Sequence, residues 1–258
     1  MAQDAANRSE LTLAVFVDFE NLALGAEHLK GGRFDIELVL KRLLEKGRIV
    51  AKRAYCDWTR YRQFMQEFHQ LGFEMIDIPQ TKMSGKNSAD IRMVVDALDL
   101  CYSKSHIDAF ALLTGDSDFS PLVSKLKEND KRVIGCGIRN STSNLLAGSC
   151  DEFIFYDDLV KVVQRSKSRT KKSRGGEQSE QQEALDRVAQ TVDSLVTEYD
   201  PLWGSLVKQA VRRIYPGFNE TAYGYRSFSE LLEDAAKHGL VELEFDKERG
   251  NYKVRARE

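Results

Sequence analysis

The sequence predicts an α/β protein with a doubly wound parallel sheet, of strand order about 3-2-1-4-5, and a second, small winged helix-turn-helix domain. Two observations predict this class. Over residues 11–163, short apolar runs alternate with helical patterns, as in βαβ units. Over residues 184–257, three helical patterns precede two short strand-like runs.

The first block alternates strands and helices in chain order. We expect strands at Leu11–Asp18, Arg48–Asp57, Phe73–Pro79, Asp108–Asp116, Lys131–Ile138 and Glu152–Asp157. We expect helices at about 34–47, 58–71, 89–102, 119–129 and 142–148. The first strand is almost continuously apolar, which is typical of a parallel strand covered on both faces. No GxGxxG motif follows it, so a dinucleotide-binding domain lacks its main support.

The rest of the chain divides at a segment without apolar side chains. Residues 164–183 cannot bury a core and are predicted to be a basic, flexible linker, and residues 1–10 a flexible N-terminus. In the last block we expect helices at about 184–198, 203–214 and 227–238. Strand-like runs at 240–245 and 251–256, joined by a polar turn that contains glycine, complete the winged helix-turn-helix pattern.

The net charge of −2 does not exclude a nucleic-acid partner, because the charge is unevenly distributed. Residues 1–164 carry 21 basic and 24 acidic side chains, and residues 177–258 carry 11 basic and 16 acidic ones. Residues 165–176, between them, carry six basic side chains and no acidic one. These cations can hold RNA phosphates non-specifically, or the segment is simply a solvated linker.

The compartment is predicted from absences in the sequence. The N-terminal residues have no apolar core of the kind that a signal peptide needs, and no apolar stretch is long enough to span a membrane. The four cysteines are widely spaced and form no CxxC pair. We therefore expect reduced cysteines in a cytoplasmic protein without a membrane anchor.

Aspartates follow two strands of the predicted sheet at their carboxyl ends. Asp18 ends the first strand, and Asp116 and Asp118 follow the fourth. Open α/β sheets bind ligands where the strand order reverses, and strands one and four are neighbours at that point. Asp90, at the start of the helix before strand four, can add another carboxylate.

Such a group of carboxylates needs cations to offset its repulsion. Oxygen ligands without histidine or cysteine suit Mg²⁺ or Mn²⁺, which assist hydrolysis of phosphate esters. Asp90 and Asp118, each taken alone, can equally be helix caps. Small phosphate esters remain a weaker alternative to a polymeric substrate.

Three motifs resemble those of the NYN domain, a branch of the PIN-like metal-dependent ribonucleases. They are Val15–Leu22 (VFVDFENL), Lys86–Asp90 (KNSAD) and Leu113–Phe119 (LTGDSDF), in the family's order and spacing. The resemblance covers roughly residues 11–160 and is greatest to the bacterial LabA-like subgroup. It implies a PIN-like fold, metal bound by Asp18, Asp90, Asp116 and Asp118, and a role for Asn21 in orienting water or phosphate.

The last block resembles the LOTUS domain, also called OST-HTH. The resemblance rests on Gly224–Leu232 (GYRSFSELL), Gly239–Val241, Trp203–Leu206 and Tyr215–Asn219. It implies a winged helix-turn-helix that binds RNA or another protein. A purely structural role also remains open, because Ser-Phe-x-x-Leu-Leu occurs in ordinary capped amphipathic helices.

Candidate RNA-contacting residues come from both blocks. In the first block they are three basic residues of loops expected to border the crevice: Lys82, Lys86 and Arg139. In the last block they are the basic residues Lys208, Arg212 and Arg226, beside Tyr225 as a base-stacking side chain.

The leading hypothesis is a metal-dependent endoribonuclease that cleaves RNA phosphodiester bonds and uses its C-terminal module to hold the RNA. The alternatives are a non-catalytic RNA-binding regulator that keeps the fold, and a protein-interaction scaffold acting through the C-terminal domain. A homodimer through the nuclease block is compatible with the sequence, although no interface signal is readable in it.

Overall fold

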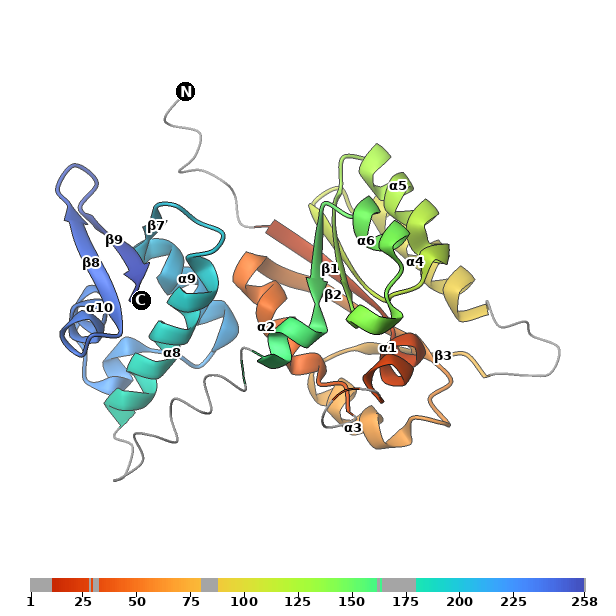
Figure 1. Cartoon of the computed structure of the whole chain (residues 1–258), viewed down its shortest axis with the longest axis horizontal. Coiled ribbons are helices and arrows are strands. Elements are labelled where there is room, and N and C mark those ends of the chain that lie inside the picture. Colours follow the sequence, from red (N-terminus) through yellow and green to blue (C-terminus); the bar gives the residue numbers. More distant parts are fainter. Residues whose placement is uncertain are drawn as a thin grey trace. The chain divides into compact units, whose positions relative to one another are not determined.

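The computed structural model describes residues 11–27, 29, 33–79, 88–161, 163 and 180–257. These residues form two compact units (Figure 1). Residues 164–179 of the predicted linker, the predicted flexible N-terminus, Lys82 and Lys86 lie outside the described residues. The last four residues of the predicted linker, 180–183, are helical and begin α8 (Glu180–Leu195), so the linker ends earlier than predicted. No helix in the described ranges is long and apolar enough to cross a membrane.

The first unit alternates strands and helices, as expected. Its strands are β1 (Leu11–Asp18), β2 (Gly47–Cys56), β3 (Glu74–Asp77), β4 (Ala109–Leu113), β5 (Arg132–Gly137) and β6 (Glu152–Phe155). Its helices are α1 (Phe19–Ala26), α2 (Ile36–Lys46), α3 (Arg62–Gln70), α4 (Ser88–Ser103), α5 (Ser120–Glu128) and α6 (Asn144–Ser149). Two short 3₁₀ turns, η2 (Ser117–Phe119) and η3 (Arg139–Ser141), follow β4 and β5.

The strands form one six-stranded parallel sheet of order β3-β2-β1-β4-β5-β6. The expected 3-2-1-4-5 order is confirmed, and β6 adds an edge strand beside β5. In the β1–β4 pair, Val17 is in register with Leu113. The carboxyl ends of these two strands therefore lie side by side, at the point where the strand order reverses.

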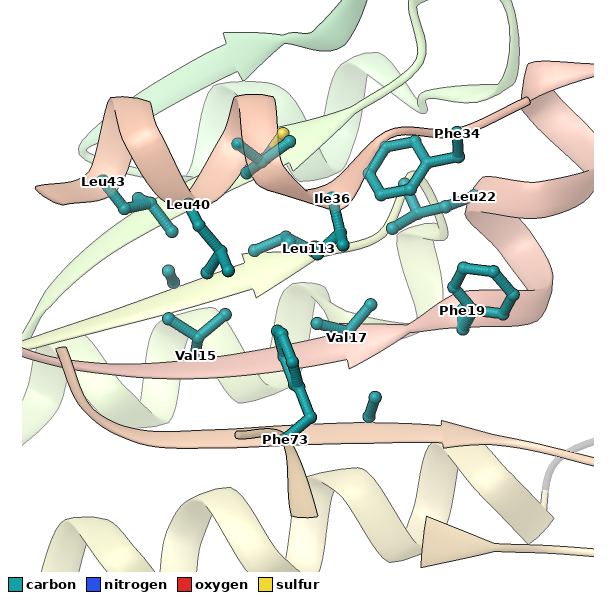
Figure 2. Close-up of a cluster of buried hydrophobic side chains, with 14 of the residues drawn as sticks. Val15, Val17, Phe19, Leu22, Phe34, Ile36, Leu40, Leu43, Phe73 and Leu113 are labelled. Carbon is teal, nitrogen blue, oxygen red and sulfur yellow. The ribbon is translucent and has the colours of Figure 1, made fainter. Parts of the chain in front are cut away.

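Strand β1 is buried on both faces, as its continuous hydrophobicity predicts. Val15 and Val17 point to one face, where they pack with Leu40 and other residues of the helices that cover it (Figure 2). Phe16 points to the other face and belongs to the cluster that includes Met93 of α4. Full burial of each large side chain contributes about 1.5–3 kcal/mol, so Asp18 follows a strand that is held firmly in the core.

The second unit contains three helices and a small antiparallel sheet. They are α8 (Glu180–Leu195), β7 (Leu202–Trp203), α9 (Gly204–Ile214), the 3₁₀ turn η4 (Glu220–Tyr223), α10 (Phe228–Lys237), β8 (Val241–Asp246) and β9 (Asn251–Ala256). The sheet order is β7-β9-β8. The three helices and the terminal hairpin match the expected elements, whereas β7 was not predicted, because two residues are too few to show a strand pattern.

One helix of the first unit was also not predicted. Helix α1 begins directly after β1, and Asp18 is its N-cap, accepting a hydrogen bond from the backbone N–H of Asn21 at 3.3 Å. From the sequence, Asp18 was expected to be a strand-end carboxylate and not a cap. In the structure Asp18 is both, and it is only 8% exposed.

Candidate functional site

Asp18 occupies a polar position at the end of the buried strand β1. Besides capping α1, it accepts a hydrogen bond from the Thr114 hydroxyl, with 3.0 Å between Oγ1 and Oδ2. Thr114 is fully buried and directly follows β4. The parallel pairing of β1 and β4 brings these two residues together.

The turn after β4 is organised by its own side chains. Thr114 Oγ1 accepts the backbone N–H of Asp116 at 3.2 Å, and Asp116 Oδ1 accepts the backbone N–H of Asp118 at 2.9 Å. Asp116 therefore caps η2, and Asp118 is exposed. One threonine hydroxyl thus contacts both the carboxylate that ends β1 and the backbone that carries the next acidic residue.

The pKa values show that the aspartates of these two strand ends act on one another. Burial, together with the charges of Asp90 and Asp116, raises the pKa of Asp18 to about 7, although the hydrogen bonds from Asn21 and Thr114 act in the opposite direction. Burial, with the charges of Asp116, Asp118 and Glu20, raises the pKa of Asp90 to about 6. The acidic side chains at these two strand ends and at the start of α4 are therefore near enough for the charge of one to act on another.

Asn21 has a structural partner rather than a free side chain. Its Oδ1 accepts the backbone N–H of Gly115 at 2.9 Å, so the first turn of α1 holds the loop after β4. Gly115 packs so closely on the next loop that a Cβ would lie 2.4 Å from the carbonyl oxygen of Ser141. Only glycine fits there, and this close contact holds the backbone immediately before Asp116 in position.

Glu20 is expected from the sequence to be solvent-exposed, although its position close to Asp18 in the chain would also let it reach the carboxylate site. Its side chain is 25% exposed, and it forms an ion pair with Arg60 at 3.0 Å. Its charge contributes to the raised pKa of Asp90. Thr114 is thus a residue of the site that was not predicted from the sequence, and Glu20 is less exposed than expected. The available signal for Thr114 was a polar residue directly after an apolar strand, next to the neighbouring strand's aspartate.

The acidic side chains near the ends of β1 and β4 are of the chemical type that binds a divalent metal. They are all oxygen donors, a chemistry that suits Mg²⁺ or Mn²⁺, and burial with neighbouring negative charges raises the pKa of Asp18 and of Asp90. Within the described ranges, however, no three or more acidic, histidine or cysteine side chains are close enough to form a metal site as they lie. The donors fit such an ion chemically, but they are not gathered into a complete coordination shell.

Arg139, expected at the border of the crevice, is engaged by its neighbours. Its guanidinium lies 3.9 Å from the ring centroid of Phe155 and 2.6 Å from Asp158 Oδ2. Its side chain is nevertheless 48% exposed. A phosphate at this point would therefore compete with Asp158.

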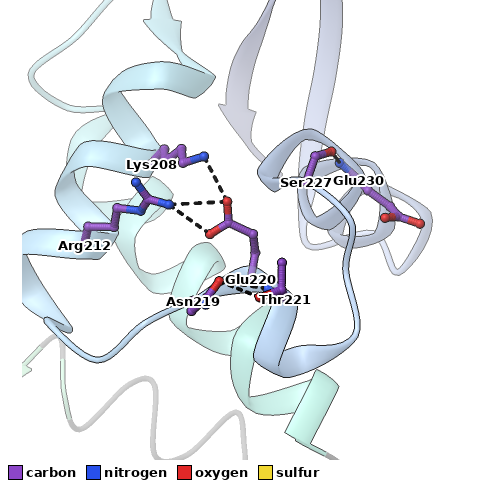
Figure 3. A network of polar contacts seen from close by, with 7 residues as sticks. All are labelled: Lys208, Arg212, Asn219, Glu220, Thr221, Ser227 and Glu230. Atoms are coloured by element: carbon purple, nitrogen blue, oxygen red, sulfur yellow. Dashed lines mark hydrogen bonds and ion pairs between the residues drawn. The ribbon is translucent and has the colours of Figure 1, made fainter.

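The candidate RNA residues of the second unit have internal partners. Lys208 and Arg212 contact the buried Glu220 at 2.9 Å and 3.4 Å (Figure 3). Tyr225 is only 6% exposed, and its hydroxyl donates to Asp234 at 2.7 Å. Its ring belongs to the core and has no free face for a base, whereas Arg226 is exposed.

Known proteins resemble part of this chain. A curated relative, an uncharacterized protein of Methanocaldococcus jannaschii, is 28% identical over 167 residues, which are 65% of this chain and 64% of the relative. The chain thus spans less than two thirds of that relative's length. A crystal structure of a protein of unknown function from Vibrio parahaemolyticus superposes with a TM-score of 0.52 and 25% identity, covering 59% of this chain and 97% of the other.

The profile of the NYN domain matches residues 12–157, a range that runs from the start of β1 to just past β6 and includes Asp18, Asn21, Asp90, Asp116 and Asp118. NYN domains are PIN-like, nuclease-type domains that generally bind RNA, and PIN-like nucleases usually use divalent metals. The match ends at residue 157 and does not include the C-terminal block, which resembles the LOTUS domain in sequence. The chain belongs to the NYN domain family.

Proposed function

We propose that the protein is a metal-dependent ribonuclease that hydrolyses RNA phosphodiester bonds at the crevice between the ends of β1 and β4. The observation that carries the proposal is the convergence of acidic residues at the ends of β1 and β4, where Thr114 is hydrogen-bonded to both the Asp18 carboxylate and the backbone of Asp116. Burial, with the charges of neighbouring aspartates, raises the pKa of Asp18 and of Asp90. A nuclease-type family and a strand-order reversal at the same position support it.

In this proposal, Asp18, Asp90, Asp116 and Asp118 hold Mg²⁺ or Mn²⁺, which when bound supplies Lewis-acid polarisation of the phosphate. Thr114 orients the Asp18 carboxylate through its 3.0 Å hydrogen bond. Asn21 keeps the Gly115 backbone in position. We assign the second unit as a LOTUS-type winged helix-turn-helix that helps to hold RNA, with Arg226 as its exposed candidate contact.

The test is RNA cleavage by the purified full chain in Mn²⁺ or Mg²⁺, followed on single-stranded and structured RNA. We expect metal-dependent cleavage that Asp116→Asn reduces by at least about 100-fold, because the substitution removes a charge from the metal site. Asp130→Asn, at an exposed turn of the same unit, is the matched control and keeps wild-type activity. Equal RNA loss with wild type and Asp116→Asn would identify a contaminant and refute the proposal.

The alternative function is an RNA-binding regulator without catalysis. It is favoured by the absence, in the described part of the chain, of three donors close enough to hold an ion. Intact RNA after prolonged incubation with metal, together with salt-sensitive binding, would decide for it.

A further inference from the structure

Helix α4 presents an apolar stripe to solvent in addition to its buried face. Its inner face carries Met93, Ala97 and Cys101, which pack on the sheet. Ile91 is 63% exposed and Val95 is 56% exposed. Neither the hydrophobic core nor the position of Asp90 at the start of this helix accounts for that outer face.

The exposed apolar residues are spaced as a helix-pairing seam. Ile91, Val95, the half-buried Leu98 and the 66% exposed Tyr102 follow one another at intervals of four, three and four residues. This is the spacing of the contact positions of a two-helix seam, about 3.5 residues per turn. Scattered exposed apolar side chains need no explanation, but a seam of them along one helix marks an interaction surface.

We propose that this surface binds a second copy of the same chain, with the two α4 helices antiparallel across a two-fold axis. In that arrangement Val95 packs beside the partner's Leu98, and Ile91 beside the partner's Tyr102. A two-fold interface uses the same patch on both copies, so a stripe that is symmetric about its own midpoint suits it. The spacing of four, three and four residues is the same in both directions.

Charge complementarity argues for a second copy as the occupant. Arg92 and Asp99 are seven residues apart and therefore lie on the same flank of the stripe. In antiparallel helices the same flanks face each other, so Arg92 of each copy lies beside Asp99 of the partner subunit. Both side chains are at exposed positions. Arg92 also pairs with Asp96 at 3.0 Å, but Asp96 has the Tyr55 hydroxyl as another partner at 2.9 Å.

The seam is short, which predicts a weak dimer rather than an obligate one. It requires only the outer face of α4 and does not rest on the proposed ribonuclease function. Sedimentation velocity of the full chain, without RNA or metal, over about a hundredfold range of protein concentration tests it. We expect a concentration-dependent monomer–dimer equilibrium for the wild type.

A pair of matched valine substitutions locates the interface. Val95→Lys should abolish the dimer, because it places two ammonium groups in an apolar seam. Val50→Lys makes the same change at another exposed valine, on β2, and should leave the equilibrium unchanged. A wild type that stays monomeric, or a Val95→Lys variant that dimerises like the wild type, overturns the proposal.

Charge reversal tests the antiparallel register. Arg92→Asp and Asp99→Arg should each weaken self-association by about tenfold or more, because each creates two like-charge pairs across the axis. An equimolar mixture of the two variants should recover a dimer. In it, one copy has acidic side chains at positions 92 and 99, and the other copy has basic side chains at both positions. Thermal unfolding of each variant establishes that it is folded. Folded variants whose mixture associates no better than either variant alone refute the antiparallel pairing.

Discussion

At the ends of β1 and β4, one buried hydroxyl group joins two acidic residues that are distant in the sequence. Thr114 donates to the Asp18 carboxylate and accepts the backbone N–H of Asp116. Its side chain has no contact with solvent, so both hydrogen bonds are shielded from water and are stronger than they would be at the surface. This residue positions the proposed ligands without being one.

Thr114→Val keeps the shape of the side chain and removes both hydrogen bonds. We expect RNA hydrolysis to fall about 10–100-fold, as is usual when a residue that supports a metal ligand is removed. Because the Thr114 hydrogen bond lowers the pKa of Asp18, its loss raises that pKa further and moves the acidic limb of the pH–rate profile upward. Thr114→Ser keeps the hydroxyl and restores most of the activity. A Thr114→Val enzyme with a wild-type pH profile would contradict this role.

The raised pKa of Asp18 predicts how the stability of the metal-free protein depends on pH. Between the ordinary value of 3.8 and the folded value of about 7, the folded state keeps a proton that the unfolded state releases. Stability therefore falls as the pH rises through this interval, by about 2–4 kcal/mol from this group. Thermal unfolding with a chelator, from pH 4.5 to 7.5, measures the trend.

Asp18→Asn should reduce this loss of stability with rising pH, because the substituted side chain does not titrate. Mn²⁺ should oppose the loss in the wild type, because a bound cation favours the charged carboxylate. Asp130→Asn is the control for loss of one exposed charge. A wild type that becomes steadily more stable from pH 4.5 to 7.5 in chelator would contradict the predicted burial of Asp18.

At the scale of elements, the second unit is organised by a carboxylate between a helix and a turn. Glu220, in η4, is buried against Lys208 and Arg212 of α9 (Figure 3). Burial disfavours its ionisation, but the hydrogen bond and charge of Lys208, together with Arg212, outweigh burial and lower its pKa. Two of the cations expected to meet RNA thus stabilise their own domain.

Glu220→Gln should destabilise the second unit by about 1–3 kcal/mol, because it leaves Lys208 and Arg212 without their shared carboxylate. The same contribution is present in the wild type above the ordinary Glu pKa of 4.5 and is lost as the pH falls through the lowered folded pKa. Hydrogen exchange of the backbone amides of α9 and α10 measures the change in stability of the second unit. Glu244→Gln removes a 57% exposed carboxylate that also pairs with two cations, and should change exchange little. Equal effects of the two substitutions would refute the structural role of Glu220.

At the scale of the whole molecule, the sequence predicted the features that follow from hydrophobic periodicity and from the polar residues at strand ends. Alternating elements predicted the parallel sheet, and the polar residues that follow β1 and β4 predicted which side chains would be neighbours. Helix α1 was missed because its eight residues directly continue a strand. The burial of Tyr225 and the engagement of Lys208 by Glu220 depend on tertiary packing, which no local pattern records.

The six basic residues of the segment 165–176 remain the largest uninterrupted cationic feature of the sequence. With Lys208 and Arg212 held by Glu220, RNA binding by the full chain should depend on this segment more than on the second unit's own cations. Replacing all six with glutamine should weaken RNA binding. It should also make the slope of log affinity against log salt shallower, by about 0.7 for each phosphate of a single-stranded RNA that is no longer neutralised.

A variant in which residues 165–176 are shuffled at constant composition is the matched control. Because counterion release depends on the number of charges and not on their order, the shuffled chain should keep both the affinity and the salt slope of the wild type. Fluorescence anisotropy with a labelled single-stranded RNA, over a series of salt concentrations, measures both quantities. If the glutamine variant keeps the wild-type slope, phosphate binding must come from the folded units, and Arg139 and Arg226 become the first residues to replace.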